Sequence, residues 1–595
     1  MEFIAQNFVP LMFVGLLLFL LTGFPVAFSL AATGLTFGLL GMEVDLFPRV
    51  LFQALPLRVF GIMQNDTLLA IPFFTLMGII LQRSGMAEDL LETVGQVFGS
   101  LRGGLALAVV FVGALLAATT GVVAAAVISM GLISLPIMLR YGYNRSVATG
   151  VITASGTLAQ AIPPSLVLIV MADQLGRSVG DMYSGAMLPA LLLVGLYIAF
   201  IVVVAIFQPK WVPALPPEAL IYKEANGSTG HKSLLAIMLI AAAAGYLWST
   251  MHDGIISPMV GRESKAPADE IFILSMTIAS FTALGLALIN SALRLKLLSK
   301  LSERVTFVLI PPLVLIFLVL GTIFLGVATP TEGGAMGALG ALIMAVARRK
   351  LSFDLLKQAL DNTVKLSCFV MFILIGSTVF SFTFNAADGH IWVEHLFNKM
   401  PGGQLGFLIA VNFLVFVLGM FIDFFEIAFI VIPILAPVAD KMGIDLIWFG
   451  VIIAFNLQTS FLTPPFGFAL FYLRSVAARA DYTDRITNQR IPAVTTTQIY
   501  KGSIAFICLQ LIMLGLIIAF PNLVLGNLDK APVVDLDTIK LEAETGGYGK
   551  SGQDPMRGFD MPEAAEPVPQ TGDSAEPEDP MEAMQRSLEQ DAKKK

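Results

Sequence analysis

Polar residues interrupt otherwise apolar segments at four places in this chain of 595 residues, and these are the positions where its chemistry is expected. Two of the interruptions contain a Pro-Pro pair, which breaks a helix because proline lacks the amide donor and clashes with the preceding turn. Backbone groups freed inside a membrane are tolerated only where protein buries them or where they line a polar cavity. Exposed carbonyls with nearby hydroxyl and amide oxygens suit a hard cation such as Na⁺, and the amino ends of half-helices suit a carboxylate. The four interruptions are residues 118–121, 155–165, 419–426 and 456–465.

The two Pro-Pro pairs, Pro163-Pro164 and Pro464-Pro465, stand in corresponding places of the two halves of the chain. For a single break, a simple kink with hydroxyls bonded to the preceding turn is an equally good explanation. Paired breaks in two halves are instead typical of the binding site of a secondary transporter.

Two acids, Asp423 and Glu426, lie at the tip of a predicted hairpin in an apolar setting. An intramembrane carboxylate is costly and therefore indicates function. The alternative is that the tip lies near the interface and both acids are hydrated. In either case Asp423 is the better candidate for cation coupling, because Glu426 is able to serve as an acid at a helix start.

The segment from Thr329 to Glu332 has two explanations. Thr329 fits an N-cap, Pro330 the first helical position and Glu332 the third, which together make a capping box. The other explanation is a direct role in a transport site. His390 and His395 do not share a helix face, and Cys368 and Cys508 sit in apolar segments, so no metal cluster, disulfide framework or cofactor is expected.

Composition supports a membrane protein: 56% of residues are hydrophobic and 13% are charged. Apolar pieces of about 20 residues, long enough to cross a bilayer, recur along most of the chain. The predicted fold class is an all-α polytopic membrane protein, built as an inverted repeat with two re-entrant hairpins and two broken helices. Basic loops should face the cytoplasm, which predicts twelve crossings with both termini outside.

The predicted organisation has four parts. Each repeat holds five crossings and one hairpin, with hairpins over residues 103–139 and 404–439. Between the repeats lie a linker and an inserted, peripheral pair of helices at about 234–248 and 271–289. Acids outnumber bases in the C-terminal tail, which is too polar to fold. The predicted boundaries are 1–210 for the first repeat, 211–299 for the linker and inserted pair, 300–527 for the second repeat and 528–595 for the acidic disordered tail.

Several motifs, taken together and in order, resemble one family. They cover residues 68–86, the segments SGTLAQAIPPS and GVATPTEGGAMGALGAL, and the segments GMFIDFFEI and LQTSFLTPPFGFALF. The chain is similar, over roughly residues 5–210 and 300–525, to the large membrane subunit of tripartite ATP-independent periplasmic (TRAP) transporters. The segments RYGYNRSVATG and FIDFFEI look closest to its mannitol and chloroaromatic subgroup.

The resemblance implies a Na⁺-coupled elevator importer of an organic acid (carboxylate) in the bacterial inner membrane. Such a subunit works with a small four-helix membrane subunit and a periplasmic solute-binding protein, in which selectivity largely lies. The rival functions are an ion or solute channel, an integral-membrane enzyme and a sensor or scaffold. A channel would need neither a delivering partner nor two closed hairpins, and an enzyme would need paired catalytic carboxylates or a histidine cluster at membrane depth.

Carried over residue by residue, the resemblance also implies the ligands. Val122 and Val123 stand where the family usually has a serine pair, which weakens side-chain coordination at the first cation site. The cation-binding residues would be Thr119, Thr120, Gly121, Ser155, Gly156 and Thr157 at one site, and Gly419, Asp423, Gln458, Thr459 and Thr463 at the other. The substrate-binding residues would be Gln160, Pro163, Ser165, Asn456, Pro464, Thr329 and Thr331.

Overall fold

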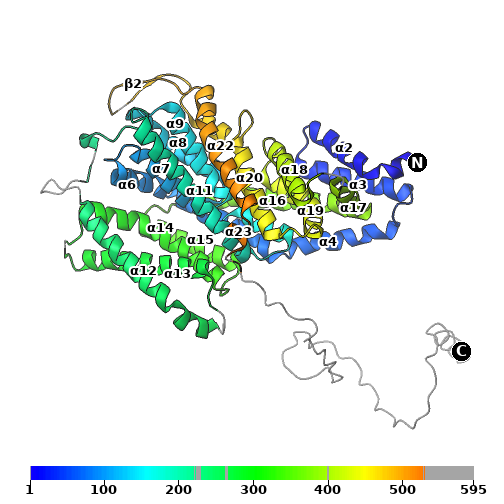
Figure 1. Ribbon diagram of the computed structural model, residues 1–595, viewed down its shortest axis with the longest axis horizontal. Coiled ribbons are helices and arrows are strands. Elements are labelled where there is room, and N and C mark those ends of the chain that lie inside the picture. Colours follow the sequence, from blue (N-terminus) through cyan, green and yellow to red (C-terminus); the bar gives the residue numbers. More distant parts are fainter. Residues whose placement is uncertain are drawn as a thin grey trace, which may run out of the picture. The chain divides into compact units, whose positions relative to one another are not determined.

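The computed structural model is almost entirely helical (Figure 1). It describes residues 2–219, 221–222, 230–260, 265–295, 297–398, 401–484, 486–526 and 528. Apart from residue 528, the predicted disordered tail lies outside these ranges. The all-α polytopic fold class is confirmed: ten helices of the described part are long and apolar enough to cross a membrane.

Those ten helices do not coincide with the twelve predicted crossings. The ten helices include α8, which belongs to a hairpin. They do not include α2 or the helices of the two broken segments, each of which is too short to cross a membrane alone. The predicted number of crossings therefore stays a prediction.

The first part of the chain begins with two helices joined by a tight turn. Gly23 takes a left-handed conformation with a φ of +81°, and Pro25 directly precedes the second helix. Three short helical segments follow before the next long helix. The elements are α1 (Glu2–Gln6), α2 (Phe8–Leu21), α3 (Val26–Glu43), η1 (Arg49–Ala54), α4 (Leu55–Met63), η2 (Asp66–Leu69), α5 (Ala70–Arg83) and the amphipathic arm α6 (Met86–Phe98).

The predicted hairpin and broken helix come next. Gly121, in the left-handed region at φ +58°, turns the chain between the two hairpin helices. The broken segment begins at an Asn144 N-cap, whose Oδ1 accepts the amides of Ser146 and Val147. The elements are α7 (Gly104–Thr120), α8 (Val123–Arg140), α9 (Arg145–Thr157), η3 (Leu158–Gln160), α10 (Leu166–Leu175), α11 (Val179–Phe207) and η4 (Pro217–Ala219).

The second part repeats this order of elements: a helix pair, a further long helix, an arm, a hairpin, a broken helix and a last helix. A two-stranded hairpin in the loop before the last helix was not predicted. The elements are α14 (Lys300–Phe324), α15 (Pro330–Ala347), α16 (Phe353–Ala386), α17 (Gly389–Asn398), α18 (Gly403–Leu418), α19 (Phe424–Lys441), α20 (Leu446–Phe461), α21 (Phe468–Val476), β1 (Tyr482–Thr483), β2 (Arg490–Ile491), α22 (Thr496–Ala519) and α23 (Asn522–Leu525).

Between the two parts lies the predicted inserted pair, α12 (His231–Val260) and α13 (Ala268–Ala292), which pack on each other and on α14. Both helices are longer than predicted. Their extra turns carry ionisable residues that the apolar segments lack, and the Nε2 of His252 lies 2.9 Å from the Oε1 of Glu270 in a buried position. Such a pairing lowers the cost of burying these two side chains beyond the apolar centres of the helices.

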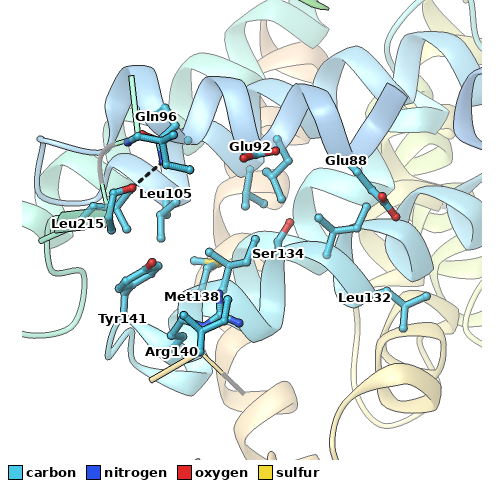
Figure 2. Close-up of a pocket in the computed structure, with 18 of the residues that line it drawn as sticks. Glu88, Glu92, Gln96, Leu105, Leu132, Ser134, Met138, Arg140, Tyr141 and Leu215 are labelled. Atoms are coloured by element: carbon cyan, nitrogen blue, oxygen red, sulfur yellow. Dashed lines mark hydrogen bonds between the residues drawn. The ribbon is translucent and has the colours of Figure 1, made fainter. Parts of the chain in front are cut away.

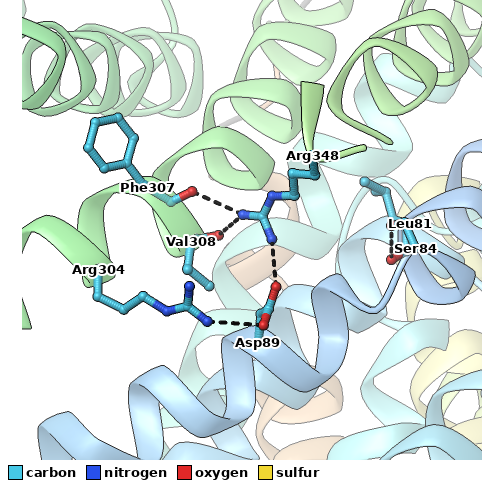
Figure 3. A network of polar contacts seen from close by, with 7 residues as sticks. All are labelled: Leu81, Ser84, Asp89, Arg304, Phe307, Val308 and Arg348. Carbon is cyan, nitrogen blue, oxygen red and sulfur yellow. Dashed lines mark hydrogen bonds and ion pairs between the residues drawn. The ribbon is translucent and has the colours of Figure 1, made fainter. Parts of the chain in front are cut away.

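Arm α6 is fixed to the helix pair α14 and α15 by one carboxylate (Figure 3). Asp89 on the arm accepts hydrogen bonds of 3.1 Å from Arg304 and 3.1 Å from Arg348. Arg348 also donates to the carbonyl oxygens of Phe307 and Val308. The donors of both guanidinium groups converge on one side of α6, so the arm is tied to α14 and α15 as well as to the adjoining hairpin.

The helix breaks are shorter than predicted. Helical structure continues through Thr157, and as η3 through Gln160, so only residues 161–165 of the predicted 155–165 are unwound. In the second half α20 continues to Phe461, so the break covers residues 462–467 rather than 456–465. The reason is local: a proline removes only its own amide and disturbs only the turn before it, which leaves earlier turns intact.

Candidate functional site

Both helices of the first hairpin contact the end of α9, the segment that holds Ser155 and Gly156. A Cβ added to Gly113 of α7 would lie 2.5 Å from the Cβ of Ser155. A Cβ on Gly156 would lie 3.1 Å from the amide nitrogen of Val127 in α8. The hairpin tip also reaches the second half-helix, since a Cβ on Gly121 would lie 2.9 Å from the Cγ of Leu166. Both sides of the break therefore meet the hairpin.

Several polar atoms in this region are buried without a protein partner. The Oγ of Ser155 and both amide atoms of Gln160 have none within the described residues, and both side chains are fully buried. Thr157 donates to the carbonyl oxygen of Ala154 at 2.9 Å and Ser165 to that of Gln160 at 2.8 Å. Because a buried unpaired polar group is costly, these atoms indicate a place for a ligand or water.

The second hairpin meets α20 in the same manner. A Cβ on Gly419 would lie 3.0 Å from the Cβ of Ser460. Beyond this tip, Asp423 is the N-cap of α19: its Oδ1 accepts the amide of Phe424 at 2.7 Å, and Glu426 accepts the amide of Asp423 at 3.2 Å. Both acids thus form a capping box, which matches the role expected for Glu426 and adds one for Asp423. No base in the described part pairs with either carboxylate.

Hydroxyl and amide oxygens also lie at the end of α20 and directly after it. Thr459 donates to the carbonyl oxygen of Phe455 and Thr463 to that of Thr459, so each hydroxyl oxygen keeps acceptor capacity. Gln458 is fully buried with its amide close to the Tyr197 hydroxyl, but neither amide atom makes a hydrogen bond among the described residues. This is the same condition as that of Gln160 in the first half.

Sequence reasoning missed one residue of the second site, Asn412 of α18. Asn456 donates to its carbonyl oxygen at 2.6 Å and to its Oδ1 at 2.9 Å, which joins the hairpin to α20. A single asparagine within the apolar run GFLIAVNFLVFVL was the available signal, since a buried amide needs a partner.

The remaining predicted site residues fall in three places. The backbones of Thr119 and Thr120 end α7, but their side chains lie outside what the structure describes. Pro163 and Pro464 lie in the breaks themselves. Thr329 and Glu332 form the capping box, which is one of the two explanations that the sequence left open, and Thr331 donates to the carbonyl oxygen of Asp66 at 2.5 Å. No hydrogen bond in the described part joins Thr329 or Thr331 to the broken helices.

The two broken helices lie side by side, since α10 packs against α20 and α19, and η3 against α20. A hydrogen-bond chain continues from the first break to α11 and α22: Gln510 donates to Tyr197 at 2.8 Å and to Thr157 at 3.4 Å. The two groups of unpartnered oxygens thus belong to one helical core, with a hairpin on each.

A cavity of about 600 Å³ separates arm α6 from hairpin helix α8 (Figure 2). Glu88, Glu92 and Gln96 of the arm face α8 across it. On the side of α8, the Oγ of Ser134 is buried without a partner among the described residues. Gln96 binds the linker at its rim, donating to the carbonyl oxygen of Ala219 and accepting the amide of Ile221. The cavity leaves room between the arm and the hairpin.

This fold defines a polytopic membrane protein whose two halves each set a hairpin against a broken helix. The sequence matches the family described as "Tripartite ATP-independent periplasmic transporter, DctM component" over residues 13–523. The chain belongs to this family, and it is a multi-pass membrane transporter subunit.

Relatives of several named functions are similar to the chain. The C4-dicarboxylate TRAP transporter large permease protein DctM of Pseudomonas aeruginosa is 28% identical over 73% of this chain and 83% of its own length. The protein of the same name from Rhodobacter capsulatus is 27% identical over 85% of this chain and 97% of its own length. The sialic acid TRAP transporter large permease protein SiaM of Vibrio cholerae is 24% identical over 85% of this chain and 95% of its own length. The crystal structure of the Alcanivorax borkumensis YdaH transporter aligns with 80% of this chain and 88% of its own chain, at 13% identity and a TM-score of 0.45.

Proposed function

We propose that this protein is the Na⁺-coupled permease of a tripartite importer for an organic acid. The observation that carries the proposal is the pair of buried glutamines, Gln160 and Gln458, whose amides have no partner among the described residues. Each stands in the last helical residues before a break, within a hairpin-enclosed region. Unpaired amides at two such places favour ligand binding over simple kinks, because a kink needs no buried polar atoms.

The available oxygens fit Na⁺ at both hairpins. Ser155 and Thr157 supply neutral oxygens in the first half, and Gln458, Thr459 and Thr463 do so in the second, while the buried amide of Gln160 is left for the substrate. Oxygen ligands of this kind suit hard cations. Asp423 adds one negative charge at the second hairpin, which supports cation coupling there. The carbonyl groups of residues 161–165 and 462–467 are the remaining candidate ligands.

The substrate class follows from the family rather than from the geometry. Relatives are named for C4-dicarboxylates, sialic acid and isethionate, all of which are organic acids. We infer an organic acid for this chain, delivered by a periplasmic binding protein, and a small four-helix membrane subunit as partner. On the motifs RYGYNRSVATG and FIDFFEI, we further place the chain in the mannitol and chloroaromatic subgroup.

The same proposal covers location and mechanism. The protein lies in the bacterial inner membrane with its basic loops, including the loop before α22, in the cytoplasm and both termini outside. Hairpins and broken helices, together with α22, which packs directly on α9, move as an elevator against the remaining helices. The cavity between α6 and α8 supports this motion, because it leaves the hairpin free of the arm over part of its surface.

The test is uptake into proteoliposomes that hold this chain and its small subunit, with the binding protein added outside. Mass spectrometry of the purified binding protein identifies the ligand, which is then supplied in labelled form. We expect accumulation against a gradient that requires inward sodium and the binding protein. Flux that only follows the solute gradient, without sodium, would instead establish a channel, and chemical conversion of the ligand would establish an enzyme.

A further inference from the structure

A second polar cavity, of about 350 Å³, lies away from the helix breaks, where the loop before α22 covers the turn between α8 and α9. In Figure 1 this is the region where β2, α9 and α22 lie together. Three arginines from separate elements line it: Arg140 at the end of α8, Arg145 at the start of α9 and Arg490 in β2. No carboxylate is among the described residues that line it.

The arginines are only partly neutralised. Asp484 pairs with Arg140 at 2.9 Å and Asp481 with Arg490 at 3.0 Å. Arg145 makes no ion pair in the described part, although the Asp481 carboxylate attracts it from beyond ion-pair distance, and its Nε is buried without a hydrogen-bond partner. Three guanidinium groups against two carboxylates leave one positive charge in excess. A buried guanidinium donor without an acceptor calls for an anion or water at that position.

The other donors around the cavity reinforce this preference for an anion. Gln498 uses its Oε1 to accept the amide of Thr495, which leaves its Nε2 available as a donor. Ser146 contributes a hydroxyl group, and Gln489 a further amide. The amides at the start of α9 are already bound by Asn144, so side chains rather than the helix end would hold the ligand.

We propose that this cavity is a binding site for a phosphate group. Donors reach it from the start of α9, from the loop strand and from α22, that is, from different directions. A tetrahedral anion with several oxygens satisfies such a set, whereas a planar carboxylate is satisfied by one arginine fork. The phosphate belongs either to the headgroup of an anionic lipid or to a soluble ion. A bound phosphate joins the base of α9 to the loop and to α22.

The experiment uses the full-length protein in a neutral detergent. Inorganic phosphate is titrated calorimetrically at constant sodium concentration and ionic strength, with acetate as the comparison anion. In parallel, the protein is reconstituted with phosphatidylglycerol or phosphatidylcholine, and native mass spectrometry counts the retained lipid. We expect saturable binding of phosphate, selective retention of phosphatidylglycerol, or both. Phosphatidylglycerol alone identifies the lipid source, and phosphate alone identifies the soluble one.

Variants locate the site. Arg145→Gln should weaken binding at least about tenfold, because a charge-assisted hydrogen bond is lost. Arg490→Gln changes an exposed side chain, so it should fold normally and also weaken binding. Arg479→Gln, in the same loop but outside the cavity lining, is the matched control and should bind as the unmodified protein does. The proposal would be overturned if neither phosphate nor phosphatidylglycerol bound saturably. It would also be overturned if acetate bound as well as phosphate, or if both cavity variants kept full binding.

Discussion

Gly150 of α9 and Gly502 of α22 bring the two helices into direct backbone contact. A Cβ on Gly150 would lie 2.7 Å from the carbonyl carbon of Gly502, and a Cβ on Gly502 would lie 2.9 Å from the amide nitrogen of Gly150. These helices begin beside each other at the loop and carry Thr157 and Gln510, which are joined by a hydrogen bond. The glycine contact therefore sets the position of the first broken helix.

Gly502→Ala should destabilise the protein. The added methyl group would meet backbone atoms of α9, which cannot rotate away as a side chain can. The resulting overpacking should lower the free energy of unfolding by about 1–3 kcal/mol. The melting temperature in detergent should fall, and uptake should fall with it because α9 is displaced. Gly515→Ala in the same helix is the control: its Cβ meets nothing within 4 Å, and helix propensity should raise stability by about 1 kcal/mol. Equal effects of the two substitutions would contradict the packing argument.

Gln458→Leu should separate stability from sodium binding. The amide atoms make no hydrogen bond in the described part, so the protein without sodium should keep or raise its melting temperature. Sodium should no longer raise the melting temperature of this variant. In the unmodified protein, bound sodium stabilises the folded state by about 2.7 kcal/mol at a concentration of 100 times its dissociation constant. Melting curves in sodium and in N-methylglucamine measure the difference.

Gln96→Leu is the control for this prediction. Its amide holds the linker near α6, far in the chain from the breaks, so the melting temperature should fall while the sodium response remains. A full sodium response in Gln458→Leu would show that the cation lies elsewhere.

Asp423→Asn should weaken sodium coupling without unfolding hairpin helix α19. Asparagine is as good an N-cap as aspartate, so the acceptor for the amide of Phe424 is kept while the charge is lost. The sodium concentration for half-maximal uptake should rise at least about tenfold, equivalent to about 1.4 kcal/mol. Glu426→Gln, which keeps an acceptor for the amide of Asp423, should change it little. Equal shifts in both variants would assign the effect to the capping box.

The loop before α22 should stay in place in mild acid. Both carboxylate oxygens of Asp484 accept a hydrogen bond from the Nε of Arg140 at 3.0 Å. The carboxylate also accepts the backbone amides of Ile486 and Thr487. The Arg140 guanidinium holds the pKa of Asp484 well below its usual range. Because this pKa is lowered by folding, the stabilisation is fully present above the unfolded value of about 3.9. It is lost only as the pH falls below that value, toward the folded pKa.

Hydrogen exchange of the amides of Ile486 and Thr487 checks this prediction. Protection should be equal at pH 7 and pH 5, after correction for the intrinsic rate, and Asp484→Asn should reduce it at both. Asp481→Asn, which leaves the pair of Arg140 and Asp484 in place, should not. Protection that already falls between pH 7 and pH 5 would mean that Asp484 titrates in its ordinary range.

The sequence by itself determined the features that depend on neighbouring residues. Apolar segments of sufficient length become helices in any membrane protein, because the backbone must be satisfied within the segment. Pro163-Pro164 and Pro464-Pro465 broke their helices, and Thr329 with Glu332 formed the predicted capping box, because these effects act within one turn. The breaks were predicted too long because polar residues such as Asn456 and Gln458 were counted as part of the break. Only the prolines interrupt the helix, and their effect is limited to the adjoining turn.

Only the tertiary structure decided which distant segments meet. Asn412 became a partner of Asn456, and Gly150 of Gly502, through packing between helices that no local pattern records. The same packing left Gln160 and Gln458 buried without partners in the described part, and it brought Arg140, Arg145 and Arg490 to one cavity. Burial and pairing are properties of the assembled helices, since the cost of an unpaired amide or guanidinium arises only when neighbouring elements exclude water from it.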